Sequence, residues 1–160
     1  MRKLLLGILL FMGFGTLQSQ ETSSAINQKD AENLKQGKWV ITGEMRKDTA
    51  YSASSIIEEG EYENGRKIGL WKRYYPNGNV QSKINYISGR PKGLYELYYD
   101  NGQVEEQGNW NRNKNIGDFK RFYENGEMMQ HFQFADNGKR NGIGNGKKNP
   151  NMATKAKEPW

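Results

Sequence analysis

Histidine and cysteine, the residues that most often carry nucleophilic or zinc chemistry, are almost missing from this sequence. His131 is the only histidine among 160 residues, and cysteine does not occur. A Cys–His pair is therefore impossible, a Ser–His triad would depend on His131, and a zinc site rich in histidine or thiolate ligands cannot be assembled. Alternation with Phe132 and Phe134 indicates an exposed strand position for His131. We expect no enzyme activity, no metal and no cofactor.

Glutamates are numerous enough to suggest the carboxylate pair of a glycosidase. The candidates are Glu58, Glu59 and Glu61 in one segment and Glu105 and Glu106 in another. They recur at repeat positions or lie opposite arginines in the strand register derived below. We therefore interpret them as cross-strand ion pairs and solubilising residues.

Aromatic side chains are the residues best suited to binding, because stacked rings present flat apolar faces to a glycan or a peptide. They recur every 24 residues in four columns. The columns are Trp71, Tyr95 and Phe119; Tyr75, Tyr99 and Tyr123; Tyr74, Tyr98 and Phe122; and Tyr62, Tyr86, Trp110 and Phe134.

A tandem 24-residue repeat, seen in residues 65–78, 89–102 and 116–126, generates these columns. Asn-Gly at 77–78, 101–102 and 125–126 predicts hairpin turns, because both residues tolerate positive φ. We expect the other turns as four-residue loops at 64–67, 88–91 and 112–115, with Pro91 inside a turn. The predicted fold is all-β, an elongated single-layer antiparallel β-meander of tandem 24-residue hairpin repeats.

Four-residue loops at both ends fix a register in which large rings lie over glycines. In this register Arg73 lies beside Glu58 and Arg121 beside Glu106, pairs worth about 0.2–1 kcal/mol each. The remaining pairs set Trp71 against Gly60 and Ile84; Tyr95 against Ile84 and Gly108; Phe119 against Gly108; and Tyr62, Tyr86 and Trp110 against Gly69, Gly93 and Gly117.

The register divides the aromatic residues between two faces. The Trp71 face is the expected structural interior. The Tyr74 face is the expected binding surface, because a single layer cannot bury both. The Trp71 face contains Tyr62, Gly69, Trp71, Tyr75, Tyr86, Gly93, Tyr95, Tyr99, Trp110, Gly117, Phe119 and Tyr123, and the Tyr74 face contains Tyr74, Tyr98 and Phe122 among Lys72, Glu96 and Lys120.

The repeat resembles the membrane occupation and recognition nexus (MORN) repeat in its bacterial variant form, over about residues 56–142. Where that repeat usually has glycine–x–glycine, the second position here is Trp71, Tyr95 or Phe119, followed by the aromatic pair and Asn-Gly typical of the variant. The resemblance also implies a grouping with YwqK-type proteins labelled as antitoxins, a label that carries no mechanism.

Residues 1–20 differ from the rest of the chain. Arg2 and Lys3 precede an apolar run over 4–17, which is shorter than the about 20 residues needed to span a bilayer as a helix. We predict a signal peptide cleaved near Ser19–Gln20, no transmembrane segment after cleavage, and a periplasmic or secreted protein.

The expected organisation places a linker at 21–36, a repeat domain at 37–142 and a disordered basic tail at 143–160. The first unit, 37–55, is degenerate, since Gly37-Lys38-Trp39 aligns with Gly69-Leu70-Trp71 at a spacing of 32 instead of 24. Eight extra residues would form a protruding loop within 47–55. Residues 21–137 contain 16 basic and 17 acidic side chains, so the net charge of +6 lies near the termini and nucleic-acid binding is not expected.

The functional prediction is an exported scaffold for protein–protein interaction, with antitoxin-like neutralisation of a protein partner as a special case. The alternative is a carbohydrate- or cell-envelope-binding module that uses the aromatic columns. The partner itself is not identified by the sequence.

Overall fold

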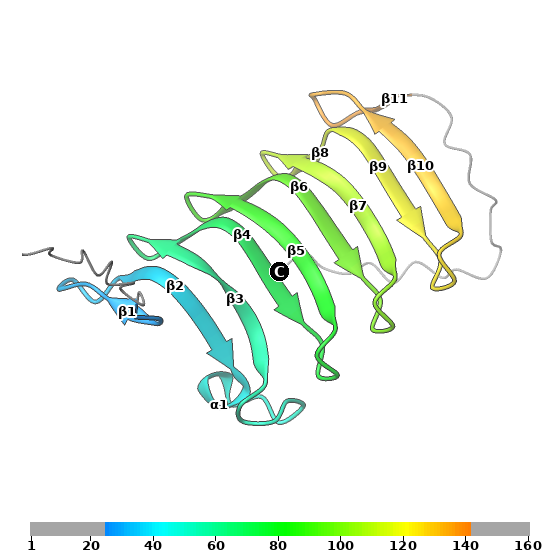
Figure 1. Cartoon of the computed structure of the whole chain (residues 1–160). Coiled ribbons are helices and arrows are strands. Elements are labelled where there is room, and N and C mark those ends of the chain that lie inside the picture. Colours follow the sequence, from blue (N-terminus) through cyan, green and yellow to red (C-terminus); the bar gives the residue numbers. More distant parts are fainter. Residues whose placement is uncertain (1–24, 142–160) are drawn as a thin grey trace, which may run out of the picture.

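The computed structural model describes residues 25–141, which form a single curved antiparallel sheet (Figure 1). The sheet has eleven strands, and β1 to β7 followed by β9, β10 and β11 lie side by side in chain order, while β8 pairs with β7. The predicted single-layer β-meander is therefore confirmed. The expected signal peptide (1–20) and basic tail (143–160) lie outside the described residues.

The strands of this sheet are mostly seven to nine residues long, as hairpin repeats of this period require. Among the described residues, no helix is long and apolar enough to cross a membrane. The elements are β1 (Gln28–Lys29), β2 (Lys35–Thr42), α1 (Gly43–Arg46), β3 (Ile56–Glu63), β4 (Arg66–Tyr74), β5 (Val80–Ile87), β6 (Arg90–Tyr98), β7 (Val104–Asn111), β8 (Lys114–Asn115), β9 (Gly117–Phe122), β10 (Met128–Phe134) and β11 (Arg140–Asn141).

The N-terminal boundary of the sheet lies earlier than predicted. Both β1 and the start of β2 fall within the expected linker, 21–36, and pair with each other in register at Gln28↔Gln36. The indole Nε1 of Trp39 donates to the carbonyl oxygen of Gln28 at 3.2 Å. Part of the expected linker therefore belongs to the sheet, because the chain turns tightly after β1 and returns as β2, which pairs with β1.

The two ends of each repeat use different turns, and neither is the four-residue loop that was predicted for both. At 77–78, 101–102 and 125–126 only the glycine of the Asn-Gly pair has positive φ (Gly78, 87°), while the Asn77 side chain accepts a hydrogen bond from the Asn79 backbone N–H at 2.9 Å. This is a three-residue loop with a bulge. The opposite end has a two-residue type I′ turn, in which Asn64 and Gly65 have φ of 49° and 72°.

Shorter turns shift the register near them by two residues. Tyr62 pairs with Lys67, Tyr86 with Pro91 and Trp110 with Asn115, so the predicted partners Gly69, Gly93 and Gly117 were wrong across these hairpins, and Pro91 lies in β6 and not in a turn. A bulge then restores the predicted register. The pairs that agree with the prediction are Glu58↔Arg73, Trp71↔Ile84, Ile84↔Tyr95, Tyr95↔Gly108 and Glu106↔Arg121.

The strand glycines have two separate roles. A Cβ added at Gly60 would lie 2.4 Å from the Trp71 ring, and one at Gly108 would lie 2.9 Å from the Tyr95 ring, so these glycines make room for the rings as predicted. Gly69 and Gly117 instead have positive φ, 62° and 64°, and nothing lies within 4 Å of a Cβ added at either position. Ring contact was therefore the wrong explanation there, since the bulge requires a left-handed backbone.

The Trp71 face forms the core of this single layer. Trp71 and Tyr95 are each 2% exposed, and Phe119 is 7% exposed. Tyr62 and Tyr86 contact Trp71 edge to face, with centroids 4.9 and 6.5 Å away. Trp110 stacks on Tyr95 at 4.3 Å. Groups of contacting rings, with Trp71 and Tyr95 lying over the glycines Gly60 and Gly108, supply the burial that a second layer would otherwise provide.

The eight extra residues lengthen the connection between β2 and β3, residues 43–55, which forms α1 and the loop that follows it. Thr42 caps α1 by accepting from the Met45 backbone N–H, and the loop contains Tyr51, whose hydroxyl donates to the Tyr74 carbonyl oxygen at 2.8 Å. Equivalent bonds run from Tyr75 to Tyr98 at 2.7 Å and from Tyr99 to Phe122 at 2.9 Å. The first unit thus retains the connection to its neighbour despite the insertion.

Candidate functional site

A row of side chains crosses the sheet on the Tyr74 face and includes three of the predicted binding residues. Register pairs link Glu59 to Lys72, Lys72 to Lys83 and Lys83 to Glu96. The row continues through Gln107 to Lys120 and His131. Tyr74, Tyr98 and Phe122 follow Lys72, Glu96 and Lys120 by two residues on the same strands, so alternation places all six predicted residues on this face.

In the repeat that contains Tyr74, its hydroxyl donates to Glu59 Oε1 at 2.6 Å, and Lys72 Nζ lies 3.5 Å from the same oxygen. Burial, followed by the hydrogen bond to Glu59, raises the pKa of Tyr74 to about 12. The same hydrogen bond is the main cause that lowers the pKa of Glu59. At neutral pH Tyr74 is therefore protonated and donates its hydroxyl hydrogen to the Glu59 carboxylate.

The repeat that contains Tyr98 combines the same three residue types. Here the glutamate, Glu96, lies on the same strand as the tyrosine, β6, and the lysine, Lys83, lies on the neighbouring strand β5. Tyr98 donates to Glu96 Oε2 and receives a hydrogen bond from Lys83 Nζ at 2.7 Å. Lys83 Nζ also lies 3.4 Å from Glu96 and 4.9 Å from the centroid of the Tyr98 ring. The hydrogen bond from Lys83 to Tyr98 is the main cause that raises the pKa of Lys83, so this lysine remains a cation.

Two exposed leucines beside this row were missed in the sequence. Leu70 is 46% exposed and Leu94 is 68% exposed. Together with Lys83, Glu96 and neighbouring residues they line a groove of about 480 Å³. Their recurrence 24 residues apart, each directly after the bulge glycine, is the signal that could have found them.

The third unit replaces leucine by Asp118 at this position. Asp118 Oδ1 lies 3.0 Å from His131 Nε2, and this contact is the main cause that lowers the pKa of Asp118. Asp118 and Lys120 also line the groove. Within residues 25–141, no cluster of three or more histidine, aspartate or glutamate side chains is arranged to hold a metal ion.

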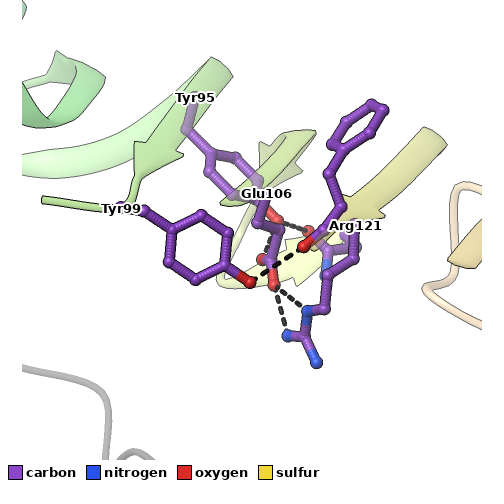
Figure 2. Close-up of polar contacts among 6 residues, drawn as sticks. Tyr95, Tyr99, Glu106 and Arg121 are labelled. Atoms are coloured by element: carbon purple, nitrogen blue, oxygen red, sulfur yellow. Dashed lines mark hydrogen bonds and ion pairs between the residues drawn. The ribbon is translucent and has the colours of Figure 1, made fainter. Parts of the chain in front are cut away.

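On the Trp71 face, Glu106 is the centre of a buried polar network (Figure 2). Tyr95 donates to Glu106 Oε1 at 2.7 Å, and Arg121 Nε donates to Oε2 at 3.0 Å. Burial, followed by the charge of Glu106, raises the pKa of Tyr95. The Tyr99 hydroxyl, which lies beside this network in Figure 2, donates to the Phe122 carbonyl oxygen at 2.9 Å. The predicted placement of Arg121 beside Glu106 is confirmed, and the carboxylate is occupied by these two contacts.

Comparison with known protein families gives one match, to the MORN repeat variant, at residues 67–88, 91–112 and 116–136. This range lies within the 56–142 expected from the sequence, and each matched segment covers most of one hairpin repeat. No curated protein matches the chain. The YwqK-type grouping stays a prediction. The chain therefore carries three MORN repeats of the variant type between residues 67 and 136.

Proposed function

We propose that this protein is a scaffold that binds a protein partner through the Tyr74 face. The observation that carries the proposal is the pair of exposed leucines, Leu70 and Leu94, at equivalent positions of adjacent repeats. They border one groove together with lysine and glutamate side chains. Apolar side chains surrounded by charges of both signs are typical of protein-binding surfaces.

The tyrosines of this face favour a protein partner over a glycan. Stacking on a sugar requires an exposed ring face, whereas Tyr74 and Tyr98 are half-buried and their hydroxyls are bonded to Glu59 and Glu96. Lys83 Nζ also lies over the Tyr98 ring. The rings support the row of charges, and the leucines offer the apolar contact.

Replacing both leucines by aspartate, Leu70→Asp with Leu94→Asp, tests this proposal with the residue that the third repeat carries naturally as Asp118. We expect the double variant to retain its circular dichroism spectrum and its capture of a partner from the native envelope fraction to fall at least about tenfold. Alanine at Tyr74, Tyr98 and Phe122 together is expected to reduce capture as well.

Two controls make this result specific. Ile87→Asp changes a 56% exposed apolar residue that does not line the groove, and we expect it to leave capture unchanged. Deletion of residues 143–160 is also expected to leave capture unchanged. Loss of capture on deletion of 143–160, with full capture by the aspartate variant, would place the function in the basic terminus instead.

Export is a second part of the proposal, supported by the charged and apolar pattern of residues 1–20. In an exported setting, neutralisation of a toxin would be a special case of protein binding. We expect mass spectrometry of the mature protein to give an N-terminus near Ser19–Gln20. A mature pool that begins at Met1 would contradict export by cleavage.

A further inference from the structure

Two arginines at equivalent repeat positions, Arg73 and Arg121, have different surroundings on the Trp71 face. Arg121 Nε donates to Glu106 Oε2 at 3.0 Å. Arg73 Nε is buried and has no hydrogen-bond partner. An unpaired N–H of a guanidinium group is costly to bury, because the donor has lost its water without gaining an acceptor.

The difference arises from the carboxylate opposite Arg73. Glu58 is the register partner of Arg73, just as Glu106 is that of Arg121. However, Glu58 Oε1 accepts from Lys67, and Oε2 accepts from Arg46 at 3.0 Å. Two repeats later the position of Lys67 is occupied by Asn115, and Arg46 belongs to the insertion that those repeats lack. Glu58 is thus drawn away from Arg73.

These side chains surround a pocket of about 190 Å³, with Trp71 and Tyr86 in its wall. Glu58 is the one carboxylate among its lining residues in the described part of the chain, and it faces the cations of Arg46, Lys67 and Arg73. Lys67 Nζ is held 4.0 Å from the Trp71 ring centroid. The pocket therefore carries an excess of positive charge and an unused donor next to an aromatic surface.

We propose that this pocket binds a carboxylate group, with Arg73 Nε–H as one of its donors. The bound carboxylate would take the place at Arg73 that Glu106 takes at Arg121, and guanidinium geometry matches the two oxygens of a carboxylate. Its single negative charge would offset part of the cationic excess, and any aliphatic part would contact Tyr86. The pocket shares no lining residue with the Leu70 groove, and Lys72 is the one member of the charged row on the Tyr74 face that lines it.

Nuclear magnetic resonance of the ¹⁵N-labelled protein tests the site directly, because Arg73 and Arg121 report in one sample. We expect the Arg73 Nε–H signal to shift saturably on titration with acetate, while the Arg121 signal stays in place. Sodium chloride at matched ionic strength is expected to leave both signals unchanged. Equal drift of both signals, or no shift at Arg73, would overturn the proposal, as would inorganic phosphate binding more tightly than acetate.

Two substitutions test which side chains donate to the bound carboxylate. Each introduces a residue that another repeat carries at the equivalent position. Arg73→Leu reproduces Leu97 of the second repeat, and Lys67→Asn reproduces Asn115 of the third. With the Trp71 indole N–H as the reporter, we expect Arg73→Leu to weaken acetate binding at least about tenfold. Lys67→Asn is expected to weaken it as well, because it releases Glu58 to pair with Arg73. Unchanged affinity in both folded variants would exclude this pocket as the site.

Discussion

Trp71→Ala is expected to lower the free energy of unfolding by about 3–5 kcal/mol. The Trp71 side chain is 2% exposed, contacts Tyr62 and Tyr86, and covers the backbone at Gly60. Its removal leaves a cavity in a layer that has no other elements to collapse into it. Tyr74→Ala, on the opposite face, is expected to lower the same free energy by only about 1–2 kcal/mol.

Denaturant unfolding followed by far-ultraviolet circular dichroism measures both values. Tyr74 is the matched control because it is also aromatic, lies three residues away on β4, and makes one side-chain hydrogen bond, to Glu59. Equal losses, or a larger loss for Tyr74→Ala, would show that the assignment of the two faces is reversed.

The second large effect concerns the glycine beneath that ring. Gly60→Ala is expected to lower the free energy of unfolding by about 1–3 kcal/mol, because its Cβ would lie 2.4 Å from Trp71 and the ring must move. In the Trp71→Ala background this loss should largely disappear, since the atoms that clash are gone. A double-mutant cycle measures this coupling.

Gly69→Ala is the control for the cycle. Its φ of 62° disfavours any residue with a Cβ, by about 1–2 kcal/mol, but no atom lies within 4 Å of the added group. Its effect should therefore add to that of Trp71→Ala without coupling. If the effects of Gly60→Ala and Trp71→Ala on the free energy of unfolding are also additive, the close approach of the Trp71 ring to the Gly60 backbone does not contribute to stability.

The repeat period and the alternation of side chains were enough to predict the single sheet and the buried row of Trp71, Tyr95 and Phe119. Turn length was not, because Asn-Gly is compatible with both a type I′ turn and a type I turn followed by a bulge. The positive φ of Asn64, which Asn77 does not share, distinguishes the two turns. The register was therefore wrong by two residues next to the type I′ turns and by one residue next to the Asn77-Gly78 loop, where Tyr74 pairs with Val80.

The candidate sites were predictable only in part for a related reason. The period places Tyr74, Tyr98 and Phe122 on one face, but it does not show that Glu59 and Glu96 occupy the tyrosine hydroxyls and leave Leu70 and Leu94 as the exposed apolar groups. The pairing of Glu58 depends on Arg46, which comes from an irregular insertion. The 24-residue period predicts only the contacts that all repeats have in common, whereas the contacts of these glutamates differ from one repeat to the next.

The bonds from Tyr51, Tyr75 and Tyr99 to the following repeat have a consequence for how such a protein can evolve. Each repeat donates one hydroxyl forward and offers one carbonyl oxygen to the repeat before it, so duplication of a 24-residue unit would insert a matched donor and acceptor together. Stability in such arrays is approximately a sum over units and their neighbouring contacts. Gene duplication could therefore lengthen the surface of this protein in whole steps, and each copy would then be free to diverge in the residues that face a partner.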